Sequence, residues 1–440
     1  MKINKKKISG DLQSRLCIYE TLDAILYKRQ NFDVAFDASL RGFGPMDGRD
    51  IGFAREGTMQ CLRRLGQIDD ILKTLANRPL SEIVPQQLVT LLRVGAVQIL
   101  FMDVKDHAAV DTVMRLAGEM GYDREKGFLN GVLRNLTRKH EELMTAQKGK
   151  EAILNTPEWL FKTWVQDYGE DQALKIAEAH MIPSPVDITV KSDPTGWAEK
   201  LGGEVLHNGS VRLQKSGRIP DLEGYADGEW WVQNASAALP VQLMKVEECA
   251  NIVDLCAAPG GKTLQLAAAG AKVTAVDISK NRLQRLEENL KRCNLSAEVE
   301  AADAKVWMPK RPVDAVLIDA PCSATGTIRH QPDVMHLKSQ RDIDKLIETQ
   351  KAILQRSAKF VKKGGELIYC TCSLQKSESE EVVKDFLSKN SNFELSVYTS
   401  DELNLPEDVL SPEGFIRLMP FHAEKKGGMD GFFIARIKRI

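Results

Sequence analysis

Residues 252–263 read IVDLCAAPGGKT, and this stretch decides the expected fold. Its first four residues have the apolar, β-branched character of a buried strand, and small residues form a turn after them. The apolar segment that follows Thr263 is expected to be a helix. Small residues at such a turn let the backbone approach a ligand closely, with helix N-terminal amides facing it. The stretch therefore indicates the first strand, turn and helix of a ligand-binding α/β sheet.

Further short strands are expected on both sides of this unit. Apolar runs at residues 273–276, 313–318 and 366–370 alternate with helical patterns such as Leu283, Leu286 and Leu290. This alternation predicts a doubly wound, Rossmann-like domain, closed by a last strand at 431–437. Before it, shorter strand-like pieces at 187–191, 204–206 and 211–214 predict a small α+β region.

Acidic side chains follow the predicted strands. Asp277 ends the second strand, Asp303 follows the third and Asp319 ends the fourth. Strand ends of this kind meet at one crevice, where a carboxylate can accept both hydroxyls of a ribose. The turn is not GxGxxG, and Pro259 stiffens it, so S-adenosylmethionine fits better than a nicotinamide dinucleotide. The alternative is an ordinary tight bend with solvated acids around it.

Two thiols are expected at the same edge of the sheet. Cys322 follows the fourth strand (DAPCSATGT, 319–327) and Cys372 follows the fifth (YCTCS, 369–373). A thiolate that adds to carbon 6 of cytosine makes carbon 5 nucleophilic, and a second thiol can assist release after methyl transfer. Asp319, protonated or acting through water, is the expected donor to N3 of the ring.

The other six cysteines are expected to be structural. Cys17, Cys61, Cys249 and Cys293 are interpreted as small buried apolar side chains, and Cys256 and Cys370 as packing or backbone positions. The spacing shows no disulfide framework. The close pair of Cys370 and Cys372 lacks a second half for a zinc site, so we expect no metal site.

Composition excludes several classes of protein. The chain has 440 residues, 43% of them apolar, and a net charge of -1. General disorder, a uniformly basic coat and a membrane span are therefore not expected. The basic N-terminus (MKINKKKISGDLQ) has no apolar segment behind it, so we expect no secretory signal and a cytoplasmic location.

Changes in periodicity and polarity along the sequence predict four regions. Residues 1–140 show helical periodicity, for example Leu12, Leu16, Tyr19, Leu22 and Leu26, with further helical segments at 57–75, 85–102, 108–120 and 128–136. Residues 141–156 are expected to be a linker because the surrounding stretch is polar and charged. A small α+β subdomain that recognises RNA is expected at 157–240, and the Rossmann-like domain at 241–440.

Four motifs together resemble a known family. DLCAAPGGKT (254–263), DAPCSAT (319–325), TCS (371–373) and DGFF (430–433) are similar to motifs of the NOL1/NOP2/Sun RNA cytosine-5 methyltransferases. The segments LLRVGAVQIL (91–100), HAAVDTV (107–113) and GFLNGVLR (127–134) resemble a NusB-type helical domain. The fusion is typical of bacterial methyltransferases of 16S rRNA.

The resemblance implies roles for individual residues. Cys372 takes the role of the nucleophile and Cys322 that of release, an order that spacing alone leaves open, while Asp319 faces the reacting centre. Asp277 binds the ribose, Asp303 lies by the adenine and Arg282 supports the nucleoside. The methionine part of S-adenosylmethionine lies on the turn Cys256, Ala257, Ala258, Pro259, Gly260, Gly261 and Lys262. Asn234 and Lys191 stand where the family has other residues.

RNA is the expected partner, with 16S rRNA as the target and tRNA as the alternative. Basic residues gather at 336–363 and 134–150, where they can contact phosphates. Arg329 and His330 are a further expected contact near the target. No DNA, membrane or obligate protein partner is expected. Two other classes remain open: a dinucleotide-dependent oxidoreductase, and a non-catalytic RNA-binding or antitermination factor suggested by the NusB-like half.

Overall fold

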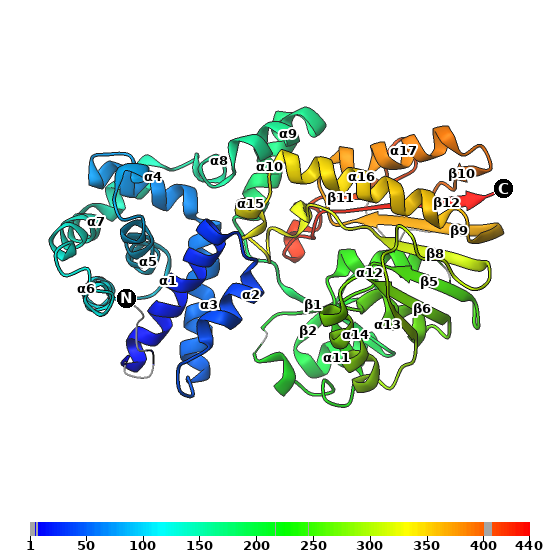
Figure 1. Cartoon of the computed structure of the whole chain (residues 1–440), viewed down its shortest axis with the longest axis horizontal. Coiled ribbons are helices and arrows are strands. Elements are labelled where there is room, and N and C mark those ends of the chain that lie inside the picture. Colours follow the sequence, from blue (N-terminus) through cyan, green and yellow to red (C-terminus); the bar gives the residue numbers. More distant parts are fainter. Residues whose placement is uncertain (1–4, 6–7, 216, 245, 400–406) are drawn as a thin grey trace. The chain divides into compact units, whose positions relative to one another are not determined.

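The computed structural model describes residues 5, 8–215, 217–244, 246–399 and 407–440 (Figure 1). The chain divides into two compact units. The first comprises residues 1–182 and 330–338, and the second comprises residues 183–329 and 339–440. Positions 1–4, 6 and 7 of the basic N-terminus, on which the expectation of no secretory signal partly rests, lie outside the described residues.

The first unit is helical, and none of its described residues lies in a strand. Its helices are α1 (Gly10–Lys28), α2 (Phe32–Leu40), α3 (Gly48–Arg63), α4 (Leu65–Ala76), α5 (Gln87–Phe101), α6 (Asp106–Glu119), α7 (Lys126–Ala146), α8 (Glu151–Asn155), α9 (Glu158–Tyr168), α10 (Glu170–His180) and α15 (Val334–Leu337). The predicted face of α1 is buried at Leu12, Leu16, Tyr19 and Leu22 and half-buried at Leu26. The helix predicted at 57–75 is split between α3 and α4, because Arg64 leaves helical geometry at φ -110°.

The prediction of a linker at 141–156 is wrong, because helices cover most of this range. Helix α7 continues to Ala146, and α8 follows after a short turn. The Gln147 amide donates to the Gln67 carbonyl at 3.1 Å and to the Asp70 carboxylate at 2.9 Å, and the Asn155 amide donates to the Gln67 side chain at 2.8 Å. These buried polar contacts hold a polar sequence against α4. Helices α9 and α10 also fold with the first unit rather than with the α+β subdomain.

Helix α15 comes from the second half of the sequence but folds into the first unit. The backbone amide of Phe32 donates to the Asp333 carboxylate at 2.9 Å, and the His336 ring lies 2.9 Å from the Leu62 carbonyl. Arg29 donates to the Leu337 carbonyl at 2.6 Å. The chain that leaves the Cys322 loop is therefore held by helices from the N-terminal part of the sequence.

The second unit begins with a small antiparallel sheet of order β2-β3-β1-β4. Its strands are β1 (Val186–Val190), β2 (Gly203–Val205), β3 (Val211–Leu213) and β4 (Trp230–Val232), and α11 (Pro194–Leu201) packs on β2 and β3. Trp230 and Ile188 lie in the core between them, fully buried. The predicted small α+β subdomain is confirmed from residue 186 onward.

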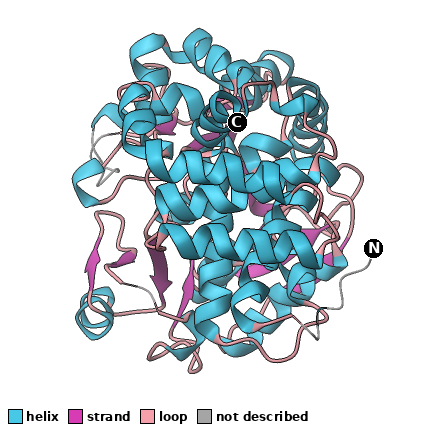
Figure 2. Ribbon diagram, turned by 90° about the vertical axis from the view of Figure 1, so that its left-hand side faces the viewer, coloured by secondary structure: helices cyan, strands magenta, loops and turns pink. Residues whose placement is uncertain are grey.

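The main sheet has the strand order β10-β12-β9-β8-β5-β6-β7, with β11 paired to β12. Strands β5 (Asn251–Leu255), β6 (Lys272–Asp277), β7 (Glu298–Ala301), β8 (Val313–Asp319) and β9 (Val361–Thr371) are parallel, while β10 (Phe393–Leu395), β11 (Ile416–Leu418) and β12 (Phe432–Arg439) are antiparallel. All the described strands, magenta in Figure 2, belong to the second unit. The predicted doubly wound domain is confirmed, and β10 and β11 were not predicted.

The helices of this domain are α12 (Ala235–Leu243), α13 (Gly261–Ala268), α14 (Lys280–Arg292), α16 (Gln340–Ser357) and α17 (Glu380–Lys389). Alternate residues of β8 serve two cores, because successive side chains of a strand point to opposite faces. Val316 and Ile318 pack with Ile353 of α16, while Leu317 packs with Leu266 of α13. Chain order reverses between β5 and β8, so ligands are expected at the carboxyl ends of these strands.

Candidate active site

The glycine turn between β5 and α13 is a close-packed cradle. Cys256 and Gly260 both have positive φ, 61° and 108°, and the peptide before Pro259 is cis. A Cβ on Gly260 would lie 2.8 Å from Leu286 of α14, so the turn has no room for a larger residue. Gly261 starts α13, whose first amides have no acceptor within the helix. The predicted succession of strand, turn and helix is confirmed.

Asp277 is almost fully buried at the end of β6 and is tied to this turn. Its carboxylate accepts the amide of Ala258 at 3.1 Å and that of Ser279 at 2.9 Å. The Arg282 guanidinium lies 3.6 Å from the same carboxylate and also donates to the Ala258 carbonyl. Asp277 and Arg282, which were predicted at the nucleoside, and Ala258, which was predicted at the methionine part, are therefore in mutual contact.

Asp319 ends β8 and forms an ion pair with Lys262 at 2.7 Å. Burial alone would lower the pKa of Lys262, but Asp319 and other neighbouring anions outweigh it and raise that pKa above its usual range. Lys262 is therefore a buried ammonium. Its partner Asp319 lies beside β9, where the Cys370 thiol is 3.8 Å from the Asp319 carboxylate. Asp303, after β7, accepts the Lys305 amide at 2.9 Å.

Asp254 is a buried carboxyl that the sequence did not single out as a functional group. Thr263 donates to one of its oxygens at 2.6 Å, and the other has no hydrogen-bond partner among the described residues. Burial raises its pKa to about 7, which the Thr263 hydroxyl only partly offsets. The floor of the glycine turn therefore carries a group that titrates near neutral pH.

The two predicted thiols are neighbours, with Cys322 Sγ 3.4 Å from Cys372 Sγ. Their strands are adjacent, since Asp319 pairs with Cys370, and the Gly326 amide donates to the Cys372 carbonyl at 2.9 Å. The hydrogen bond with Cys372, followed by burial, raises the pKa of Cys322 well above its ordinary value. Cys322 is therefore a neutral thiol that can donate to the sulfur of Cys372.

The other cysteines mostly follow prediction. Cys17, Cys61, Cys293 and Cys370 are buried, and Cys256 is a backbone position with positive φ. The prediction for Cys249 is wrong, because this residue is exposed. It lies in the turn before β5, where its positive φ of 64° fits the backbone rather than a core position.

Sequence reasoning missed Glu378, which lies between the two cysteine loops. It is fully buried and accepts hydrogen bonds from Ser323 and Ser373, the residues that follow Cys322 and Cys372. A short helical turn places it five residues beyond Ser373. The signal available was a glutamate in a serine-rich segment, which does not reveal contact with a loop 55 residues earlier in the chain.

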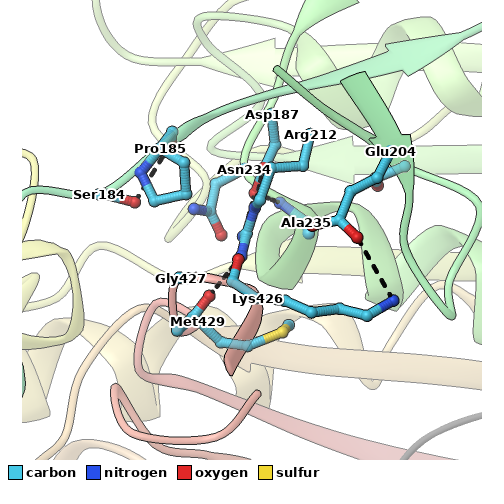
Figure 3. Close-up of polar contacts among 12 residues, drawn as sticks. Ser184, Pro185, Asp187, Glu204, Arg212, Asn234, Ala235, Lys426, Gly427 and Met429 are labelled. Atoms are coloured by element: carbon cyan, nitrogen blue, oxygen red, sulfur yellow. Dashed lines mark hydrogen bonds and ion pairs between the residues drawn. The ribbon is translucent and has the colours of Figure 1, made fainter. Parts of the chain in front are cut away.

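Buried Arg212 fastens the small sheet to the loop before β12 (Figure 3), and a second buried arginine, Arg329, also bonds to this loop. Arg212 forms a two-pronged ion pair with Asp187 at 2.7 and 2.9 Å, and it donates to the carbonyls of Lys426 and Gly428. Arg329 is 2% exposed and donates to the Pro183 and Gly427 carbonyls. The expectation that Arg329 contacts RNA is therefore wrong, because its buried guanidinium donates hydrogen bonds to backbone carbonyls of the protein.

Asn234, the position that departs from the family, caps α12. Its side chain accepts the amide of Ser236 at 2.9 Å, and the neighbouring Ala235 amide is taken by Asp187 at 3.0 Å. Asn234 is thus a helix N-cap, a role that other short side chains with an acceptor atom can also take.

Exposed basic residues occur on both units. On the second unit, α16, the turn after it and β9 present basic side chains to solvent, namely Arg341, Lys345, Lys359 and Lys363. In contrast, Lys362 pairs with Asp314, and Arg356 donates to the Val306 and Trp307 carbonyls. On the first unit, a groove of about 450 Å³ lies between α6 and α7. Its lining is Asp106, His107, Val110, Asp111, Met114, Asn130, Arg134, Thr137 and Arg138.

The described residues contain neither a cluster suited to a metal ion nor a helix suited to a membrane span. No group of three or more His, Cys, Asp or Glu side chains there is arranged to hold a metal ion. None of the helices in that part of the chain is long and apolar enough to cross a membrane.

Comparison with known proteins gives two family matches. Residues 241–438 match the RsmB/F family of 16S rRNA methyltransferases, and residues 12–138 match the NusB family. Ribosomal RNA small subunit methyltransferase B of Shigella boydii is 34% identical over 363 residues, which are 79% of this chain and 84% of the relative. The protein of that name from Shigella flexneri is 34% identical over 407 residues, covering 88% and 90%.

Solved structures share the fold. The crystal structure of PH0851 aligns with a TM-score of 0.77 at 22% identity, covering 99% of this chain and all of that one. A methyltransferase homologue from Pyrococcus horikoshii aligns with a TM-score of 0.54 at 26% identity, covering 63% of this chain and 94% of that one. The predicted NusB-like helices and methyltransferase domain are confirmed.

Proposed function

The chain belongs to the RsmB/F family of 16S rRNA methyltransferases, and from that premise we propose that it forms 5-methylcytosine in 16S rRNA with S-adenosylmethionine as methyl donor. The observation that supports this chemistry best is the 3.4 Å separation of Cys322 and Cys372 at the ends of adjacent strands. An oxidoreductase would leave both thiols unused, and a non-catalytic RNA-binding factor would not need them.

Cys372 acts as the nucleophile in this proposal. Its thiolate forms a bond to carbon 6 of the target cytosine, the 5,6 double bond shifts its electron pair toward carbon 5, and N3 gains a proton. Carbon 5 is then nucleophilic enough to take a methyl group. The target base must leave any stack to reach the sulfur, as in other enzymes that modify bases.

Cys322 acts in release. Once the Cys372 sulfur is bonded to the base, the negative charge and hydrogen bond that raise the Cys322 pKa are gone, so Cys322 ionises more readily. The Cys322 thiol first gives its proton to solvent water. Its thiolate then removes the carbon-5 proton, the electron pair of that C–H bond restores the 5,6 double bond as the bond between the Cys372 sulfur and carbon 6 breaks, and the Cys372 thiolate leaves. The two sulfurs thus exchange roles within one turnover.

Lys262 and Asp319 hold the proton that N3 requires. The sequence suggested Asp319 itself as a protonated donor, whereas the ion pair at 2.7 Å favours a carboxylate beside an ammonium. In the proposed reaction the proton passes from the ammonium through the carboxylate to N3 as the adduct forms, and it returns on elimination. Ionised Asp319 can also accept a hydrogen bond from the exocyclic amine of cytosine.

The turn and its acids suit S-adenosylmethionine, which supplies the methyl group when bound. Gly260 and Gly261 let the turn pack closely against Leu286 and Gln233, and the α13 amides face the carboxylate of the methionine part. Asp277 and Arg282 hold the ribose, and Asp303 lies by the adenine. Asp277 keeps acceptor capacity beyond its two backbone amides, since a carboxylate has about four acceptor positions.

RNA binds to exposed basic surfaces of both units in this proposal. The groove between α6 and α7 offers Arg134 and Arg138 to phosphates, while Val110 and Met114 give it an apolar floor for a base. The exposed lysines of α16 and the following strand add phosphate contacts. We place the reaction in the cytoplasm because the chemistry requires free thiols.

Transfer of tritium from labelled S-adenosylmethionine to 16S rRNA, followed by bisulfite mapping, tests the proposal. We expect one new 5-methylcytosine in 16S rRNA and none in tRNA. Methylated tRNA with unmodified 16S rRNA would change the substrate assignment. Absence of transfer to either RNA would favour the non-catalytic alternative.

A further inference from the structure

Glu378 is a buried carboxylate with an unusual number of donors directed at it. The Ser323 amide donates to it at 2.8 Å and the Ser323 hydroxyl at 2.5 Å. The Ser373 hydroxyl donates at 2.6 Å and the Gln350 amide at 3.1 Å. A fully buried carboxylate needs such donors, because an unsatisfied one is costly to bury.

These contacts join two loops that are far apart in the sequence. Ser323 directly follows Cys322 and Ser373 directly follows Cys372, so one carboxylate fixes the residue next to each thiol. The two serine hydroxyls also lie 3.1 Å apart. No other described residue hydrogen-bonds both serine side chains.

The element that carries Glu378 is itself held in place. The Tyr369 hydroxyl donates to the Glu378 carbonyl at 2.7 Å. Arg417 forms a two-pronged ion pair with Glu380 and donates to the Ser373 carbonyl at 2.6 Å. The Gln350 side chain donates to the Pro321 carbonyl as well as to Glu378. Glu378 therefore cannot move without moving both loops.

We propose that Glu378 is a positioning residue that sets the separation of the Cys322 and Cys372 thiols for the methyl-transfer reaction. It does not touch the reacting atoms, and it acts through Ser323 and Ser373. This inference rests on the proposed two-thiol function. Its geometric part, the fixed distance between the sulfurs, is measurable without RNA or methyl transfer.

The substitutions Glu378→Gln and Glu378→Asp test the charge and the length of this side chain separately. Glutamine keeps the length but replaces one acceptor oxygen by a donor, where every neighbour already offers a donor. Aspartate keeps the charge but is one methylene shorter and cannot reach both serines. Glu381→Gln, on the exposed side of the neighbouring α17 turn, is the matched control.

Diamide oxidation of the full-length protein without RNA measures the thiol separation. The two thiols lose two protons and two electrons to form a disulfide, and diamide is reduced to the hydrazine. We expect Cys322–Cys372 disulfide formation to be at least about tenfold slower in both Glu378 variants than in Glu381→Gln. Methyl transfer should fall about 100-fold, with affinity for S-adenosylhomocysteine unchanged.

A Ser323→Ala, Ser373→Ala double variant keeps Glu378 and provides a second test if either substitution of the buried acid prevents folding. Disulfide formation and methyl transfer within threefold of the control, in any folded variant of Glu378 or of the two serines, would overturn the proposal. Slower disulfide formation with normal methyl transfer would also overturn it. Failure of the proposed function is distinct, because it would appear as methyl transfer that survives Cys372→Ala.

Discussion

The two halves of the candidate active site are built in different ways. On the cofactor half, Asp277 accepts backbone amides from Ala258, at the preceding strand end, and from the neighbouring Ser279, so backbone conformation fixes the acid. On the thiol half, Cys322 and Cys372 are held through Ser323 and Ser373 by Glu378, a side chain from elsewhere in the chain. The first half depends on backbone conformation, and the second depends on one buried carboxylate.

The difference has a chemical reason. A nucleoside site needs fixed acceptors and a close backbone, which a turn of small residues provides. Two thiols that exchange roles need a set distance between loops on neighbouring strands, and no local turn provides that. Substitutions on one half should therefore leave the other half working.

Cys372→Ala gives the largest expected effect. Without the nucleophile, methyl transfer to 16S rRNA should fall at least about 1,000-fold, because carbon 5 is no longer activated. Tritium transfer measures the rate, and calorimetry with S-adenosylhomocysteine should show unchanged binding on the cofactor half. Cys249→Ala, at an exposed cysteine, is the control. Methyl transfer near the control rate would remove Cys372 from the mechanism.

Asp277→Asn tests the cofactor half alone. Loss of the charged acceptor should weaken binding of S-adenosylhomocysteine about 10- to 100-fold, the range for a hydrogen bond to a charged group. The rate of disulfide formation between Cys322 and Cys372 should not change. Glu287→Gln, exposed on α14, serves as control. A slower disulfide rate in Asp277→Asn would show that the halves are not independent.

Asp254→Asn tests whether the buried carboxyl below the glycine turn makes the stability of the protein depend on pH. The folded pKa of about 7 is above the unfolded value of 3.8, so the contribution to stability is complete below about pH 4 and is lost as pH rises through 7. Asparagine cannot ionise and keeps an acceptor for Thr263. The free energy of unfolding should therefore exceed that of the unsubstituted protein by about 4 kcal/mol at pH 8.

That advantage should shrink on going to pH 5, which urea unfolding at the two pH values measures. Equal stability of the two proteins at pH 8 would mean that the carboxyl does not titrate near neutrality.

Arg134→Gln with Arg138→Gln gives the smallest expected effect. Loss of two phosphate contacts should weaken binding of 16S rRNA about five- to tenfold at physiological salt and reduce the slope of log affinity against log salt by about 1.4. Methyl transfer at saturating RNA should be unchanged. Lys73→Gln, exposed on α4, is the control. An unchanged salt dependence would exclude the α6–α7 groove as a phosphate site.

The sequence predicted the cofactor half well and the thiol half only in part. A strand that ends in a small-residue turn, with Asp277 at the next strand end, is a local pattern, and its geometry follows from the fold. The positions of both thiols followed in the same way from adjacent strands. Glu378 could not be predicted, since its role depends on contacts across 55 residues of chain.

The same limit explains the errors elsewhere. Residues 141–156 are polar, but Gln147 and Asn155 are buried and hydrogen-bonded to Gln67, a pairing that composition does not reveal. Arg329 was predicted to contact RNA because it stands just past the Cys322 motif, yet it donates to backbone carbonyls of the protein. Cys249 was predicted in a core, whereas the turn that holds it is exposed.

In the proposed mechanism, Cys372 forms the bond to cytosine and Cys322 releases it. Full-length Cys322→Ala incubated with 16S rRNA and S-adenosylmethionine, then separated under denaturing conditions, tests this most directly. We predict a protein–RNA complex that survives the denaturant and contains the transferred methyl group, and no complex when Cys372 is also replaced by alanine. No complex with Cys322→Ala, together with full activity of Cys372→Ala, would contradict the account.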